Sequence, residues 1–427
     1  MKQNPLFDID FYKADHRRQY PAGTELVYAN FTPRFAKHAN VPDKSGIVFF
    51  GLQYFLKEFM QDVWNENFFK QPKEQVVAEY KRVMDTALGE GAIPIDHIEA
   101  LHDLQYLPIF IRALPEGTFV PVGVPVLTIE NTLPEFFWLT NYLESILSTY
   151  LWLACTSATT ARGFRKLLDS YAEATGSPSW FTDYQGHDFS FRGMSSRQSA
   201  LMSGAAHLLS FKGTDTVAAI PFLEHYYGAK GLVGTSVPAT EHSVMCMGGF
   251  DDEILTFRHL LALYNTGIVS IVSDTWDLWQ VLTHYTKVLK PEIMERDGKV
   301  VFRPDSGTPN LIIVGPAAFY DPVLANKDEN YTLESLWHQD YTHVVLEDGS
   351  YHEIKQTNDM VNYYYELGDE VAPTPEMKGA VQVLWDIFGG TKTDKGFNLL
   401  DPHVGLIYGD SIDNKMAKKI LDGLMAK

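Results

Sequence analysis

Short apolar runs that each end in a polar cluster recur from about residue 179 onwards, and helical patterns follow several of them. This alternation predicts parallel β-strands joined by helices, because parallel neighbours need a long crossover connection. In such folds the ligand site forms at the carboxyl ends of the strands, so the polar clusters are expected to face one cavity. The predicted strands are 189–191, 208–211, 268–272, 299–302 and 403–408.

Aspartates follow three of these predicted strands: Asp274, Asp305 and Asp410. Together they suggest Mg²⁺ and sugar-hydroxyl chemistry, since Mg²⁺ takes one or two carboxylates plus phosphate oxygens. Arg303 begins the turn Arg-Pro-Asp-Ser-Gly and can meet a phosphate. Taken singly, each aspartate has the alternative of a helix N-cap, and the turn that of a local Arg-Asp pair.

His242 follows Glu241 in a proline-bent loop within the same series of strands and helices. Most histidines are structural or exposed, and its position in the series favours a chemical role. Two aromatic residues beside charged ones, Tyr12 and Phe189, offer surfaces for a flat ring. Core packing is the alternative for each.

Three regions are predicted along the chain. Residues 1–150 mix strand and helix patterns and are expected to form an α+β domain. Residues 151–178 are expected to form a helical bridge, and 179–427 the α/β domain. An acidic, aromatic stretch at 328–369 is interpreted as an insertion with a hairpin at 346–351.

Composition excludes several classes of function for this chain of 427 residues. Its 54 acidic and 35 basic side chains leave a net charge of -19, which argues against a general nucleic-acid binder. The sequence has no run of 18 apolar residues, so no membrane span is predicted. The first ten residues lack the apolar core of a signal peptide, so a cytoplasmic location is expected. The two cysteines cannot build a disulfide framework or a zinc site.

Seven stretches of the chain, in order, resemble the nicotinamide phosphoribosyltransferase family, particularly its bacterial and phage type. They are Asp10-Phe11-Tyr12-Lys13 with His16, His187-Asp188-Phe189 with Arg192-Gly193, the run 211–218, Ser236-Val237-Pro238-Ala239 with Glu241-His242-Ser243, Val272-Ser273-Asp274, Arg303-Pro304-Asp305-Ser306-Gly307, and Tyr408-Gly409-Asp410.

The resemblance implies an enzyme that transfers phosphoribose from phosphoribosyl pyrophosphate to nicotinamide in NAD salvage, yielding nicotinamide mononucleotide and pyrophosphate. It implies a type II phosphoribosyltransferase fold with an irregular α/β barrel, dependence on Mg²⁺, and a homodimer with shared active sites. ATP is expected to act as a phosphoryl donor to His242.

The resemblance also implies roles for particular residues. Phe189 and the Tyr12 of a second subunit are expected to stack on the pyridine ring, and Asp215 to accept its carboxamide N–H. Asp274 and Asp305 are expected to serve the metal, pyrophosphate or ribose, and to be catalytic together with His242. The remaining expected substrate-binding residues are Arg34, Arg192, Ser270, Arg303, Gly409 and Asp410.

A carboxylate at Asp215 attracts a carboxamide and repels the carboxylate of nicotinate, so nicotinamide is the expected substrate. Two alternatives stay open: a nicotinate phosphoribosyltransferase, and a catalytically inactive paralogue that binds ligand or dimerises. The second arises because family members continue beyond the predicted helix at 414–425 into a further strand and a glycine-rich phosphate loop. We expect this chain to lack that segment.

Overall fold

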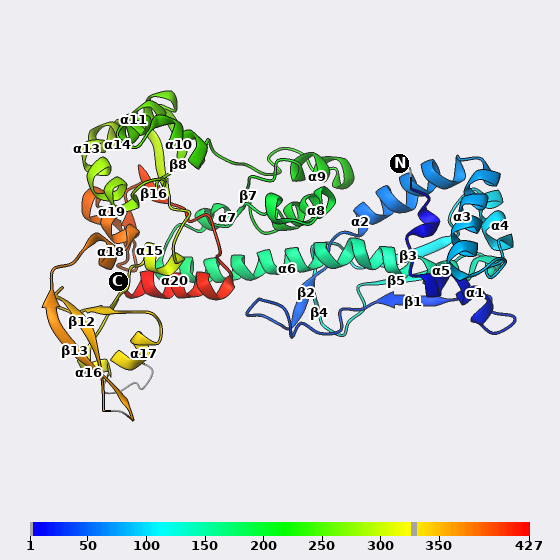
Figure 1. Cartoon of the computed structure of the whole chain (residues 1–427), viewed down its shortest axis with the longest axis horizontal. Helices are drawn as coiled ribbons and strands as arrows, with labels where there is room; N and C mark the ends of the chain where they lie inside the picture. Colours follow the sequence, from blue (N-terminus) through cyan, green and yellow to red (C-terminus); the bar gives the residue numbers. More distant parts are fainter. Residues whose placement is uncertain (1–2, 326–330, 360) are drawn as a thin grey trace. The chain divides into compact units, whose positions relative to one another are not determined.

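The computed structural model describes residues 3–325, 331–359 and 361–427, and its contacts group the chain into two compact units (Figure 1). Unit 1 comprises the residues up to 166 and residues 183–235; unit 2 comprises 167–182 and 236–427. One long helix, α6 (Glu144–Thr175), continues from unit 1 into unit 2. The domain boundaries expected at 150 and 178 stay a prediction.

Unit 1 combines antiparallel sheets with helices over an aromatic core. Strands β1, β5 and β3 form one sheet and β2 pairs with β4. Trp64, Phe68, Tyr80 and Tyr142 are almost completely buried, and burying such large rings supplies much of the stabilisation of a core. The elements are η1 (Pro5–Phe7), η2 (Phe11–Asp15), α1 (His16–Gln19), β1 (Tyr28–Phe31), β2 (Gly46–Val48), α2 (Leu52–Tyr54), η3 (Phe55–Val63), η4 (Asn65–Phe69), α3 (Lys73–Leu88), α4 (Asp96–Leu104), β3 (Ile109–Ala113), β4 (Phe119–Pro121), β5 (Leu127–Asn131), η5 (Pro134–Phe136), α5 (Leu139–Tyr142), β6 (His187–Asp188), η7 (Phe191–Gly193), α8 (Arg197–His207), β7 (Gly213–Thr214) and α9 (Ala219–Tyr227).

The two strands predicted in this part of the chain are misplaced. Strand β6 ends at Asp188, and 191–193 is a 3-10 turn. The apolar run 208–211 closes helix α8, because the backbone N–H of Leu208 donates to Gly204 O and that of Phe211 to His207 O. The parallel pair is instead β6 with β7, which directly precedes Asp215.

Unit 2 contains the parallel strands that the sequence predicts at 268–272, 299–302 and 403–408. Strand β9 pairs in parallel with β8 on one side and with β16 on the other. Their buried side chains join helices in a second hydrophobic core. The elements are η6 (Ser179–Phe181), α7 (Thr182–Gln185, which continues into unit 1), α10 (His242–Gly248), α11 (Glu253–Leu263), β8 (Thr266–Val272), α12 (Leu278–Gln280), η8 (Val281–Tyr285), α13 (Thr286–Val288), α14 (Lys290–Glu295), β9 (Asp297–Arg303), α15 (Pro309–Ile313), β10 (Ala317–Phe319), α16 (Pro322–Ala325), α17 (Leu333–Trp337), β11 (His343–Val345), β12 (Tyr351–Asn358), β13 (Tyr363–Val371), α18 (Pro375–Lys378), α19 (Ala380–Phe388), β14 (Gly390–Lys392), β15 (Asn398–Leu400), β16 (Val404–Leu406) and α20 (Asn414–Ala426).

The fold is mixed α/β, but the strands in the described ranges do not close into the expected barrel. In the described ranges, parallel pairing comprises the sheet β16-β9-β8, the pairs β6-β7 and β10-β11, and single bridges from Thr235 to Gly213 and from Ala239 to Ser270. Closure requires every strand to pair on both sides, whereas β16 pairs only with β9. Of the helices described, none has the length and apolar character needed to cross a membrane.

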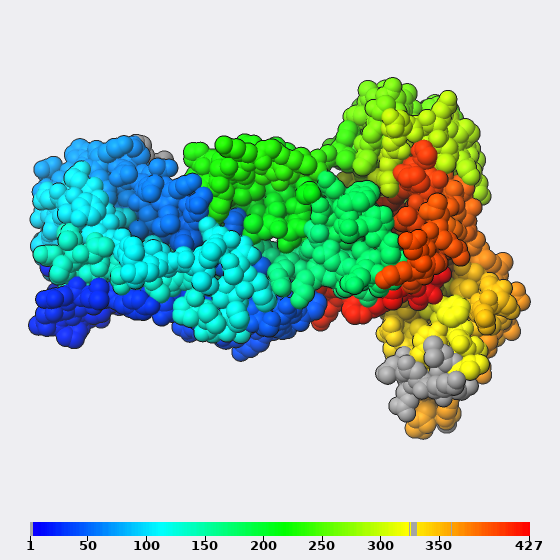
Figure 2. Space-filling model, turned by 180° about the vertical axis from the view of Figure 1, so that it is seen from behind, coloured from blue at the N-terminus to red at the C-terminus, as the bar shows by residue number. Residues whose placement is uncertain are grey.

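The region interpreted as an insertion folds around strands β10 to β13, which form one sheet. The predicted hairpin is confirmed: Leu346 donates to Ser350 O, and β12 runs antiparallel to β11. A small separate core lies beneath it, and this part of unit 2 stands out as a lobe, yellow to orange in Figure 2. Of the predicted range 328–369, residues 328–330 and 360 lie outside the described residues.

Candidate functional site

In unit 1, a cluster at the ends of β6 and β7 brings together His187, Phe189 and Asp215. The backbone N–H of Asp215 donates to Asp188 O at 2.9 Å, which anchors Asp215 just beyond β7. Nε2 of His187 lies 2.9 Å from Oδ1 of Asp215, and the His187 ring packs against Phe189 with centroids 4.9 Å apart. The cluster combines an aromatic surface with a carboxylate that is 38% exposed, which suits a flat base bearing a donor group.

The other residues expected to contact the base lie elsewhere in unit 1. Arg192 is exposed on η7, close in sequence to this cluster, and Arg34 is exposed after β1. Tyr12 is 60% exposed in η2, immediately before α1. Within unit 1, α1 and β7 lie at opposite ends (Figure 1). The structure therefore does not bring Tyr12 to the Asp215 of the same chain.

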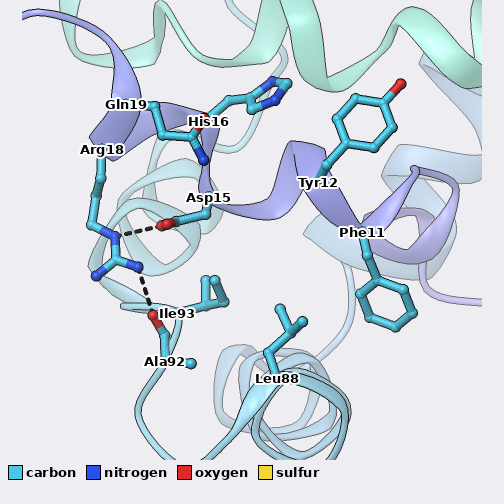
Figure 3. A pocket seen from close by; sticks show the side chains of 9 residues that line it. All are labelled: Phe11, Tyr12, Asp15, His16, Arg18, Gln19, Leu88, Ala92 and Ile93. Atoms are coloured by element: carbon cyan, nitrogen blue, oxygen red, sulfur yellow. Dashed lines mark hydrogen bonds and ion pairs between the residues drawn. The ribbon is translucent and has the colours of Figure 1, made fainter.

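A cavity of about 350 Å³ opens beside Tyr12. Figure 3 shows Arg18 at one wall, where it contacts the Asp15 carboxylate and donates to Ala92 O at 2.7 Å. The segment is anchored by the buried Lys13, whose Nζ lies 2.6 Å from an oxygen of Glu144. The exposed Tyr12 ring thus projects from a backbone that is held in place.

In unit 2, the carboxylate of Asp274 organises the loop that follows β9. Its Oδ2 accepts from the backbone N–H of Asp305 at 2.7 Å and from the hydroxyl of Ser306 at 2.6 Å. Its Oδ1 is buried and accepts no hydrogen bond within the described part of the chain. A buried carboxylate oxygen without a partner is costly, so Oδ1 is poised to bind a cation or a donor group.

The three strand-end aspartates all lie near enough to Tyr408 for their charges to act on its hydroxyl. This hydroxyl donates to the carbonyls of Ser306 and Gly307 at 2.8 and 2.7 Å. Burial raises the pKa of Tyr408 to about 12, and the charges of Asp274, Asp410 and Asp305 add to the effect. The predicted acidic rim is therefore present at one place in unit 2.

His242 stands at the first position of α10 and faces the same rim. Its Nε2 lies 3.6 Å from Oδ2 of Asp305, and its Nδ1 lies 3.3 Å from the hydroxyl of Thr275. The side chain is 48% exposed, so the ring can be reached from solvent. An imidazole held between a carboxylate and a hydroxyl is suited to accept or donate a proton, or to act as a nucleophile.

The remaining expected residues of unit 2 lie on the strands and loops that lead to this rim. Ser270 is buried on β8, where its backbone N–H donates to Pro238 O. Arg303 ends β9, and Gly409 packs so closely that an added Cβ would lie 2.5 Å from Oδ1 of Asp305. Asp410 follows on the exposed side. Only glycine at 409 therefore leaves the Asp305 carboxylate where it is.

The geometry fits a magnesium site that is completed by substrate. No group of three or more His, Cys, Asp or Glu side chains within the described ranges could hold a metal by itself. Mg²⁺ does not require one, because it often takes one or two carboxylates and fills its octahedron with phosphate oxygens and water. The unpartnered Oδ1 of Asp274 is the available ligand.

Sequence reasoning did not single out Thr275, Ser306, Tyr408 or His187 as contributors to these clusters. Each lies within one or two residues of a predicted site residue. Their contacts depend on how separate loops fold onto one another, so the only available signal was this adjacency.

Comparison with known proteins places the chain among enzymes of pyridine nucleotide metabolism. The family model described as the nicotinate phosphoribosyltransferase (NAPRTase) family matches residues 184–427, and a model of the nicotinamide phosphoribosyltransferase N-terminal domain matches residues 4–89. With the aromatic and carboxylate cluster beside β7, these matches define a phosphoribosyltransferase of pyridine bases.

Individual relatives show which family within this class of enzymes the chain resembles. The chain is 52% identical over 435 residues to a nicotinamide phosphoribosyltransferase of Acinetobacter baylyi, covering 99% of this chain and 76% of that protein. It is 29% identical to one of Mycoplasma pneumoniae, covering 98% and 81% respectively. The chain belongs to the nicotinamide phosphoribosyltransferase family. Among solved structures, human nicotinic acid phosphoribosyltransferase aligns with 80% of this chain and 67% of its own, at 14% identity and a TM-score of 0.47.

Proposed function

We propose that this chain is a nicotinamide phosphoribosyltransferase of NAD salvage, which works in the cytoplasm and makes nicotinamide mononucleotide and pyrophosphate from nicotinamide and phosphoribosyl pyrophosphate. The observation that carries the proposal is 52% identity to an enzyme of that name along 99% of the chain. Family membership also supports a type II phosphoribosyltransferase fold.

The cluster beside β7 is proposed to bind the base. Asp215 would accept the carboxamide N–H, and Phe189 would stack on the pyridine ring. Arg192 and, from a second subunit, Arg34 would meet phosphate or the ring substituent. The carboxylate of nicotinate would be repelled by Asp215, which accounts for a preference for nicotinamide.

The acidic rim in unit 2 is proposed to bind the phosphoribosyl donor. Asp274 and Asp305 would hold Mg²⁺, with the buried Oδ1 of Asp274 as a ligand. When bound, Mg²⁺ supplies charge stabilisation to the departing pyrophosphate. Arg303 would meet the same phosphates. Ser270, Gly409 and Asp410 would position the ribose and its phosphate, so that bond cleavage at the anomeric carbon begins from an aligned state.

His242 is proposed to take a phosphoryl group from ATP, releasing ADP. One ring nitrogen would attack the terminal phosphorus, and the phosphoryl group would later pass to water. The support is its exposure and its position between Asp305 and Thr275. A phosphorylated ring would add roughly two negative charges beside the acidic rim, which would change the affinity of that rim for substrate and product.

The active sites are proposed to be shared between two copies of the chain. Tyr12 is exposed at the end of unit 1 remote from β7, on an anchored segment, and so suits a second subunit. It would complete the aromatic sandwich around the base bound by its neighbour. Closed twofold dimers permit this exchange in both directions at once.

Incubation of the purified chain with nicotinamide, phosphoribosyl pyrophosphate, ATP and Mg²⁺ tests the proposal. The expected result is nicotinamide mononucleotide and pyrophosphate in equal amounts, measured by chromatography. Binding of nicotinamide without turnover would contradict it and indicate an inactive ligand-binding paralogue.

A further inference from the structure

We propose that His187 is a positioning residue that sets the selectivity of the base site by orienting the carboxylate of Asp215. This inference rests on the proposed function and concerns how the base site distinguishes nicotinamide from nicotinate. The two side chains come from neighbouring parallel strands: His187 opens β6, and Asp215 follows β7 directly. In the register of this pair His187 lies opposite Gly213, two residues before Asp215.

The contact has a defined direction. Nε2 of His187 lies 2.9 Å from Oδ1 of Asp215. An ionised carboxylate can only accept, so Nε2 carries the proton and donates. This hydrogen bond fixes the orientation of the Asp215 carboxylate, which is proposed to accept the carboxamide N–H of a bound base.

Packing holds the imidazole in this orientation. The ring is 14% exposed, and one face lies against Phe189 at 4.9 Å between centroids, with the planes tilted by 43°. The other constraint is Gly213, where an added Cβ would come within 2.6 Å of Nδ1 of His187. The His187 ring therefore occupies space that a side chain at position 213 would need.

Without the donor, the carboxylate would have further rotamers available and would be more exposed to water. A hydrogen bond to a charged group that fixes geometry contributes both affinity and selectivity, because a misplaced carboxylate neither accepts from the carboxamide nor repels nicotinate as strongly. His187 itself need not touch the substrate for this effect.

Steady-state kinetics of three variants test the assignment. His187→Leu removes the donor at similar size and is expected to raise KM for nicotinamide roughly tenfold, with a smaller change in kcat and a fall in the nicotinamide to nicotinate ratio of kcat/KM. His187→Gln retains an N–H near the position of Nε2 and should stay within about threefold of the parent. His225→Leu, an exposed histidine on α9, is the matched control and should leave both values unchanged.

A double-mutant cycle separates positioning from a general structural role. If His187 acts through Asp215, then His187→Leu adds little to the loss of selectivity already caused by Asp215→Asn. Additive effects, or an unchanged KM and selectivity in folded His187→Leu, would overturn the inference. Thermal unfolding shows whether each variant is folded, and failure of the parent chain to turn over nicotinamide would instead contradict the proposed function.

Discussion

The two carboxylate oxygens of Asp274 differ in their contacts: one is bonded to the loop after β9, and the other is proposed to be a metal ligand. One carboxylate oxygen accepts from Asp305 and Ser306, and the other is buried without a partner in the described ranges. The first oxygen holds the loop, and the second is proposed to bind Mg²⁺. A substitution that keeps the shape of the Asp274 side chain but removes its charge separates loop binding from metal binding.

Asp274→Asn should keep the loop, because the amide oxygen can still accept from Asp305 and Ser306, but it removes the charge offered to the metal. We expect kcat/KM to fall by about 100-fold or more, the typical cost of losing one preorganised electrostatic group. Asp277→Asn is the matched control, because the Asp277 side chain caps α12 and asparagine caps equally well. Equal activity of the two variants in the nicotinamide mononucleotide assay would rule out this role for Asp274.

His242→Ala should abolish stimulation of the reaction by ATP and leave a basal rate of transfer. The reason is that the ring would be the phosphoryl acceptor, while base and phosphoribose binding rely on other side chains. Rates with and without ATP measure this directly. Undiminished stimulation in the variant would refute a phosphorylated His242.

At the scale of elements, helix α11 begins with a buried carboxyl group. Glu253 is 1% exposed, and burial, with a smaller effect of the Asp277 charge, raises its pKa to about 7. In the unfolded chain its pKa is about 4.5. Between these values the folded chain holds a proton that the unfolded chain has lost, so this group's contribution to stability falls as the pH rises from about 4.5 to 7.

Glu253→Gln should therefore be more stabilising, or less destabilising, at pH 8 than at pH 5. The difference between the two pH values is expected to be about 1–3 kcal/mol in the free energy of unfolding. Urea unfolding of both proteins at each pH measures it. A substitution effect that is independent of pH would show that Glu253 has an ordinary pKa.

Some helices and strands of this chain could be predicted from the sequence, and others could not. The strands β8, β9 and β16 were predictable because continuous apolar runs ending in Gly, Pro and Asp are typical of buried parallel strands. The run 208–211 is also apolar, but it forms the turn that ends helix α8. Its hydrogen bonds to the preceding helical turn cannot be predicted from hydrophobicity. Sheet closure likewise depends on pairing between distant segments.

Site residues were predictable where they stand at strand ends, as Asp274, Asp305 and Asp410 do. Contacts between loops were not: the donation from Ser306 to Asp274 and the pairing of His187 with Asp215 need both loops in place. Residue type and adjacency therefore locate a candidate site, and tertiary packing decides which neighbours support it.

For the whole molecule, the proposed sharing of active sites between two chains predicts complementation between two inactive variants. In mixed dimers of Tyr12→Ala and Asp274→Asn, one of the two sites receives an intact Tyr12 from one chain and an intact Asp274 from the other. Random mixing by co-expression should restore about a quarter of the parent activity. Activity no higher than that of either variant alone would indicate that each chain supplies its whole site.

The proposed function requires this chain to transfer phosphoribose to nicotinamide in preference to nicotinate. The most direct measurement is kcat/KM of the purified chain for both bases, with saturating phosphoribosyl pyrophosphate, ATP and Mg²⁺. We predict a ratio of at least about 100 in favour of nicotinamide, because a site built to accept a carboxamide hydrogen bond strongly rejects an analogue that cannot donate one. A ratio below one would contradict the proposed preference for nicotinamide and identify a nicotinate phosphoribosyltransferase.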